Sequence, residues 1–179
     1  QVLAILTQLL DNERLQRLSE GLLSDSDLAQ TTIYFRHYLF DAFFLLGRSD
    51  QILQRLTLWF ELDDVGVTTL LEQPEPSRSD CHAWGAHPLY HYYASLLGIR
   101  PDAPGFSRVR IAPQPGGLEH LEGRMPHPQG DIAVEMERKK EAFAVRVSLP
   151  PETPALFVWG GMERQLLPGL HSFVVPCER

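Results

Sequence analysis

The feature that most constrains this chain is a change in hydrophobic periodicity near residue 100. Before it, apolar side chains recur every three or four residues, which is the spacing of an amphipathic α-helix. After it, apolar and polar residues alternate, which is typical of β-strands with one buried face. Prolines and glycines crowd the stretch between Pro101 and Gly117. We therefore predict an α+β chain, with a helical domain over residues 1–100 and an antiparallel β-sandwich over residues 101–179.

Helical spacing occurs in four segments before the change. The second of them is apolar on nearly every side, so we expect it to be buried among other helices. Gly47 and Gly98 follow two of the segments at the place where helices commonly end. The chain opens at Gln1 inside a helical pattern, without a signal peptide, and looks cut from a longer protein. The four predicted helices cover residues 2–23, 28–46, 51–62 and 87–97.

Alternating runs replace the helical pattern after residue 100, with turn-forming pairs such as Gly160-Gly161 between them. Many short strands separated by turn signals every 8–12 residues or so are typical of an antiparallel sandwich. The predicted strands cover residues 109–111, 131–136, 142–147, 156–159 and 172–175.

The charge balance argues against two kinds of partner. Among 179 residues there are 23 acidic and 16 basic side chains, a formal net charge of -7, and only two of the basic residues are lysines. Such a chain has no electrostatic reason to bind nucleic acid or an anionic membrane. No apolar run approaches the ~20 residues of a membrane-spanning helix. Thirteen of the acids lie in residues 1–100, so carboxylate chemistry is expected there.

The segment from residue 65 to residue 84 has no sustained periodicity and collects chemically useful side chains. Glycosidases need one carboxylic acid and one carboxylate, with aromatic surfaces for the faces of sugar rings. A plain solvated acidic loop would have a similar composition, in which Arg78 would pair with a neighbouring acid, either Asp80 or Glu75. The relevant residues are Glu72, Glu75, Arg78, Asp80, His82 and Trp84.

Metal and cofactor motifs are lacking. His87 and His91 have helical spacing but no Glu at the required place between them, and helix-capping or core roles are expected for both. Cys81 and Cys177 are far apart in the chain and are expected to be free thiols. There is no phosphate-binding glycine loop and no nucleophile elbow. We predict no cofactor and no metal.

Several motifs resemble one known family. The run SDCHAWGAHPLY, residues 79–90, resembles the C-terminal signature of the alpha-L-rhamnosidases of glycoside hydrolase family 78. The same holds for LGIRPDAPGF at 97–106, VRIAPQP at 109–115 and EGRMPHP at 122–128. Upstream, GVTT at 66–69 before Glu72 fits the same pattern. The resemblance covers nearly the whole chain.

This resemblance implies a fold and a mechanism. Residues 1–100 would be the last helices of an (α/α)6 barrel, followed by the sandwich. Hydrolysis of terminal alpha-L-rhamnosyl linkages would proceed by inversion with two carboxylates, and Glu72 occupies the place of the general base. Many members have Trp before that glutamate, where this chain has Leu71, so Glu75 and Asp80 stay competitors. The general acid would lie upstream, so the chain alone is expected to be inactive.

The remaining expectations concern binding. Rhamnoside substrates would contact His82, Trp84 and Asp80 in the loop, together with Trp59 at the nearby helix end. Helix faces left without their barrel neighbours would be exposed and could form a homodimer. The alternative interpretation is a non-catalytic structural or carbohydrate-binding module of a larger protein.

Overall fold

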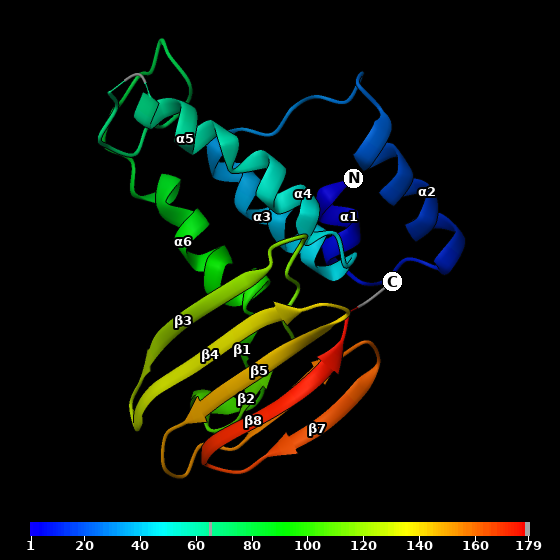
Figure 1. Ribbon diagram of the computed structural model, residues 1–179. Helices are drawn as coiled ribbons and strands as arrows, with labels where there is room; N and C mark the ends of the chain where they lie inside the picture. Colours follow the sequence, from blue (N-terminus) through cyan, green and yellow to red (C-terminus); the bar gives the residue numbers. More distant parts are fainter. Residues whose placement is uncertain (65, 178–179) are drawn as a thin grey trace. The chain divides into compact units, whose positions relative to one another are not determined.

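The computed structural model describes residues 1–64 and 66–177, and the chain divides into two compact units (Figure 1). The first unit runs from Gln1 to Tyr90 and is helical. The second begins at His91 and contains all the described strands. The predicted fold class, helices followed by strands, is therefore confirmed. None of the helices in the described part of the chain combines the length and the apolar character that crossing a membrane requires.

The helices of the first unit are shorter than predicted. The expected helix over 2–23 is two helices, because Gln8 takes a left-handed backbone conformation with φ of 55° between them. Asp11 then starts the second helix by accepting a hydrogen bond from the Arg14 N–H at 2.8 Å. The helices are α1 (Val2–Leu6), α2 (Asn12–Ser24), α3 (Ile33–Leu45), α4 (Ser49–Arg55) and α5 (Thr57–Asp64).

Helix α3 lies at the centre of this unit, as its all-round apolar sequence predicts. It begins at Ile33 rather than at residue 28, because the Thr32 hydroxyl caps it by accepting from the Phe35 N–H. Phe40 and Phe43 are fully buried. They form one apolar cluster with other buried residues of α1, of α3, and of α4 and its C-cap, namely Val2, Ile5, Leu39, Ala42, Ile52 and Leu56.

The predicted helix over 87–97 is a composite. It consists of a 3₁₀ turn (Ala83–Ala86), the short helix α6 (His87–His91) and a π-helical turn (Tyr92–Leu96). The units separate between Tyr90 and His91, earlier than the change in sequence pattern. The end of this segment is tied to later residues of the second unit: the Gly98 carbonyl accepts from the Ala112 N–H at 3.0 Å, and the Leu96 carbonyl accepts from the Gln114 N–H at 2.9 Å.

The second unit contains two four-stranded sheets. One has the order β1 (Ile99–Pro101), β2 (Val109–Ile111), β6 (Ala155–Trp159), β7 (Met162–Leu166). The other has the order β3 (His120–His127), β4 (Gly130–Lys139), β5 (Ala142–Leu149), β8 (Gly169–Pro176). The predicted antiparallel sandwich is confirmed, with one exception among its strand pairs: β2 and β6 run parallel. The remaining pairs are antiparallel.

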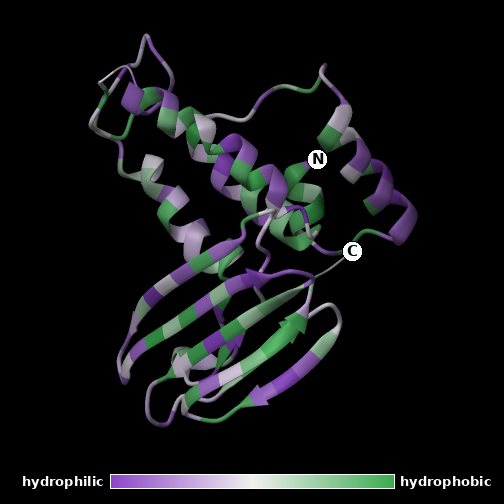
Figure 2. Cartoon of the chain, viewed as in Figure 1, coloured by the Kyte–Doolittle hydropathy of each residue, from purple (hydrophilic) through white to green (hydrophobic). Residues whose placement is uncertain are grey.

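Alternation of side chains builds the core between these sheets. Along β4, Ile132, Val134 and Met136 are buried while their neighbours are more exposed, and Figure 2 shows the alternating colours on β3, β4 and β5. Aromatic rings join the two sheets: the centroids of Phe143 and Trp159 are 5.7 Å apart. Phe157 and Phe173 make a second such contact, at 4.9 Å.

Candidate functional site

The loop between α5 and the 3₁₀ turn is folded back on itself by main-chain hydrogen bonds. The Glu72 N–H donates to the Ser79 carbonyl at 3.0 Å, and the His82 N–H donates to the Leu70 carbonyl at 2.7 Å. Leu71, between the two anchor points, is buried. These hydrogen bonds define the shape of a segment that has no helical or strand periodicity. They also fix the main chain of Glu72, at the point where the loop closes on itself.

The carboxylate of Glu72 forms an ion pair with the guanidinium of Arg78. The Arg78 Nε–H donates to Glu72 Oε2 at 2.8 Å, and Nη2 donates to Oε1, so the pair is joined at two points. The expectation that Arg78 pairs with Asp80 or Glu75 is therefore wrong. The Glu72 side chain is 12% exposed and that of Arg78 80%. The hydrogen bonds from Arg78 lower the pKa of Glu72 below its ordinary value, so the carboxyl is ionised at neutral pH.

The two competing acids of the loop have different surroundings. Glu75 is exposed, and its carboxylate accepts a hydrogen bond from the Ser77 N–H at 2.7 Å. Asp80 is exposed as well. Glu72 is therefore the most enclosed of the three carboxylates, and enclosure is what makes a charged group useful for chemistry.

Aromatic side chains gather after the loop. The rings of His82 and Trp84 lie with centroids 4.4 Å apart, and Tyr34 of α3 meets Trp84 edge-on at 5.3 Å. Tyr34 and Trp84 are 45% and 43% exposed. We call Tyr34, His82 and Trp84 the aromatic surface. The sequence pointed to His82 and Trp84 as substrate contacts but favoured a core position for Tyr34, because α3 is apolar all round and its periodicity does not identify the exposed side.

Trp59 has a different environment from the aromatic surface. Its indole N–H donates to the Gly85 carbonyl at 2.8 Å, and its ring lies 5.1 Å from that of His87. The Arg36 guanidinium stands over the same ring at 5.9 Å. These contacts fasten the 3₁₀ turn to α5, which is a packing role. A contact between Trp59 and a sugar stays a prediction.

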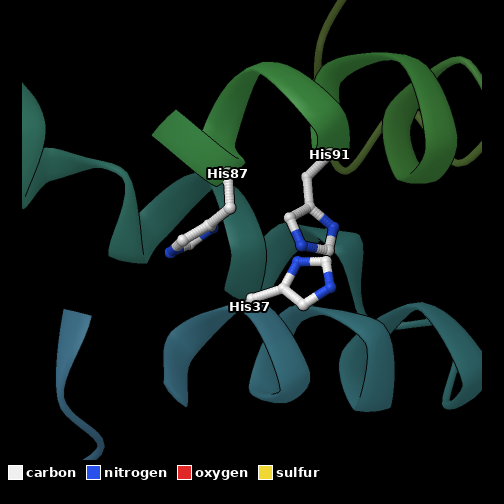
Figure 3. Close-up of side chains that lie close together, drawn as sticks. All are labelled: His37, His87 and His91. Atoms are coloured by element: carbon white, nitrogen blue, oxygen red, sulfur yellow. The ribbon is translucent and has the colours of Figure 1, made fainter. Parts of the chain in front are cut away.

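His87 is a buried, neutral histidine. Figure 3 shows it at the start of α6 beside His37 of α3, and their ring centroids are 5.8 Å apart. Its Nε2 lies 2.9 Å from the Ile33 carbonyl, and because a carbonyl only accepts, Nε2 carries the proton. Burial lowers the pKa of His87 to about 4. In the second unit, Nδ1 of His91 shares a hydrogen bond with the Ser95 hydroxyl.

A hollow of about 670 Å³ lies elsewhere in the first unit. It is bordered by α1, the end of α2, the following segment and Arg55. The predicted site residues Glu72, Asp80, His82, Trp84 and Trp59 are not among the residues that line this hollow.

Sequence comparisons identify related proteins. Residues 98–169 match the family model described as the bacterial alpha-L-rhamnosidase C-terminal domain. An alpha-L-rhamnosidase of Alteromonas sp. (strain LOR) is 31% identical over 129 residues, which is 63% of this chain and 14% of that protein. One from Streptomyces avermitilis is 26% identical over 100 residues, 55% of this chain and 10% of that protein. The chain thus spans a small part of the length of these relatives.

Solved structures share the fold. The GH78 family rhamnosidase of Bacillus sp. GL1 superposes with a TM-score of 0.78 and 28% identity, over 94% of this chain and 19% of that one. The alpha-L-rhamnosidase of Dictyoglumus thermophilum superposes with a TM-score of 0.80 over 98% of this chain and 25% of that one. At 17% identity the latter is evidence of a common fold.

Proposed function

Because this chain belongs to the alpha-L-rhamnosidases of glycoside hydrolase family 78 and corresponds to their C-terminal part, we propose that it acts in hydrolysis of terminal alpha-L-rhamnosyl linkages. Its contribution is the general base, Glu72. The observation that carries the proposal is the enclosed Glu72 carboxylate, held at two points by Arg78 at the foot of the loop. The names of the relatives supply the substrate class, and the loop supplies the group that reacts.

The mechanism requires an ionised carboxylate that can take a proton from water. Glu72 meets the first condition because Arg78 keeps its pKa low. The water attacks the sugar carbon on the face opposite the leaving group, which inverts the configuration. Inverting glycosidases hold their two carboxyl groups about 6.5–9.5 Å apart to leave room for that water. The second carboxyl, the general acid, is supplied by the barrel upstream, so this chain alone does not turn over substrate.

Arg78 has two opposing effects on such a base. It fixes the carboxylate and keeps it ionised in mildly acidic solution. A lower pKa also makes a weaker base, because proton transfer to it is less favourable. In this proposal the substrate contacts come from His82, Trp84 and Asp80 at the loop end, together with Trp59.

The proposed function is tested by hydrolysis of an aryl alpha-L-rhamnoside. We expect the longer enzyme that contains this chain to release rhamnose and the 179-residue chain to release none. Proton NMR of the freshly formed sugar should show the beta anomer first, before mutarotation. Appearance of the alpha anomer first would contradict inversion, and turnover by the isolated chain would contradict an upstream acid.

The exposure of Tyr34 and Trp84 favours a second candidate, a carbohydrate-binding module without catalysis. Exposed aromatic rings stack on sugar faces without any carboxylate chemistry. In that case L-rhamnose should raise the unfolding temperature of the isolated chain, and Trp84→Ala should abolish the increase. The catalytic proposal expects little protection, because most of the site is missing from this chain.

Changing Arg78 should alter the pH dependence of hydrolysis. Arg78 lowers the pKa of Glu72, so Arg78→Met lets that pKa rise toward its ordinary value. The acidic limb of kcat/KM, where activity is lost as the base becomes protonated, should therefore move to higher pH. Arg78→Lys, which keeps the positive charge, is the matched control and should move it less. An acidic limb that stays in place in Arg78→Met would show that Glu72 is not the group that titrates there.

A further inference from the structure

Strand β8 is an edge strand that exposes apolar side chains. It ends the sheet β3-β4-β5-β8, with β5 as its neighbour in that sheet. Leu170 and Val174 project from its outer face and are 70% and 68% exposed. Figure 2 shows the hydrophobic colour along much of β8, whereas much of β7, in the other sheet, has the hydrophilic colour.

One hydrogen bond at the end of β8 determines which of its residues direct their main-chain N–H and C=O groups toward β5 and which direct them away. The Cys177 N–H donates to the Glu141 carbonyl at 2.8 Å, one step beyond the pair of Ala142 and Pro176. Antiparallel pairs alternate between hydrogen-bonded and non-hydrogen-bonded positions. Counting back from Cys177, the main-chain groups of Leu170, Ser172 and Val174 face away from β5. Pro176 also faces away from β5, so its missing N–H removes no hydrogen bond between β8 and β5.

The opposite edge of the same sheet is protected. By the same alternation, fixed there by the bond from the Arg138 N–H to the Glu119 carbonyl, the outward positions of β3 hold His120, Glu122, Arg124 and Pro126. Charged side chains and proline on an edge discourage another strand from pairing with it. Strand β8 has no Lys, Arg, Asp or Glu between Gly169 and Pro176, and its one proline, Pro176, lies at its last position, beyond Leu170, Ser172 and Val174.

We propose that β8 is a docking edge for a second copy of this chain, paired antiparallel about a twofold axis at Ser172. This register sets Ser172 opposite Ser172 of the second copy and Leu170 opposite Val174 of the second copy. All three are outward positions, so each can exchange two main-chain hydrogen bonds across the axis.

Self-pairing suits the chemistry of this strand. The exposed apolar side chains meet each other as two cross-strand pairs, which stabilises antiparallel pairing. In a twofold dimer, charged side chains on this edge could face like charges and repel each other. Strand β8 has no Lys, Arg, Asp or Glu, so this repulsion does not arise. The two sheets would join into one continuous sheet with no unpaired β8 edge.

Sedimentation of the full 179-residue chain over a range of concentrations tests this edge. We expect a monomer–dimer equilibrium, and Val174→Lys should weaken dimerisation at least tenfold. Val174 is exposed, so the variant should keep the circular dichroism spectrum of the wild type. Glu122→Lys on β3 is the matched control and should dimerise like the wild type. A monomer at every concentration would overturn the proposal.

A cysteine at the axis tests the register. Ser172→Cys, in a chain with Cys81→Ser and Cys177→Ser, should oxidise to a covalent dimer. Facing residues of a hydrogen-bonded pair have Cα atoms about 5.5 Å apart, which a disulfide can span. Glu122→Cys in the same background should stay monomeric on oxidation. A dimer that survives Val174→Lys and gives no crosslink at Ser172 would overturn the proposal in favour of pairing through the helices.

Discussion

Replacing Glu72 by Gln in the longer enzyme should lower kcat for an aryl alpha-L-rhamnoside by a factor of about 10²–10⁴, the usual effect of losing a general base. The amide has nearly the same shape as the carboxylate but does not take a proton from water. Its oxygen can still accept a hydrogen bond from Arg78, so the loop should keep its fold. Steady-state kinetics together with a thermal unfolding curve checks both statements.

The neighbouring acids provide the controls for this variant. Glu75→Gln and Asp80→Asn remove exposed carboxylates of the same loop, and both should retain kcat within a factor of about ten. Near-normal turnover of Glu72→Gln, with a collapse in either control, would move the base to that other acid. Loss of activity in all three would point to loop structure rather than to one proton acceptor.

Replacing Gly98 by Ala should be the most destabilising single change in the second unit. Gly98 has φ of +67°, and an added Cβ would lie 2.1 Å from the Ala112 carbonyl oxygen. That oxygen belongs to main chain held by its own hydrogen bond to Gly98, so neither side can move away cheaply. We expect a loss of about 4 kcal/mol or more, which lowers the unfolding temperature by roughly 15–30 °C in a unit of this size.

Gly105 offers a matched control for that prediction. It has the same φ of +67°, but an added Cβ would have nothing within 4 Å. Gly105→Ala should therefore cost only the left-handed backbone strain, about 1 kcal/mol. Equal effects of the two variants in calorimetry would show that the close approach of Ala112 contributes nothing.

Local periodicity predicted the strands whose sequence holds a clear run of apolar residues at alternate positions, and it missed β1, β3 and β7. Strands β4, β5, β6 and β8 each contain a predicted run. Strand β7 was missed because Leu166 is its one buried residue, so it shows no alternation. Strand β3 was missed because Gly123 and Pro126 interrupt its apolar pattern. The parallel pairing of β2 with β6 depends on residues far apart in the chain, which local patterns do not encode.

The geometry of the loop could be predicted only in part from the sequence. Composition drew attention to the loop and to His82 and Trp84, whose ring centroids lie 4.4 Å apart; their contact with a sugar stays a prediction. The Glu72–Arg78 pair was not foreseen, because the two residues are neighbours only after main-chain bonds fold the loop back at Ser79. Tyr34 joins the aromatic surface from a different helix, and that proximity comes from packing within the unit.

The parallel pairing of β2 with β6 also affects the order in which the strands of the second unit pair during folding. Val109 pairs with Ala155, and three complete strands lie between them in the chain. Strands β3, β4 and β5 are joined by short turns and close through local contacts, which form quickly. The β1–β2 hairpin has to wait for β6 to arrive before its sheet can be completed, and closing that long loop costs chain entropy. On a ribosome, the meander can therefore form as soon as it emerges, while the first strands of the unit are among the last to find their place.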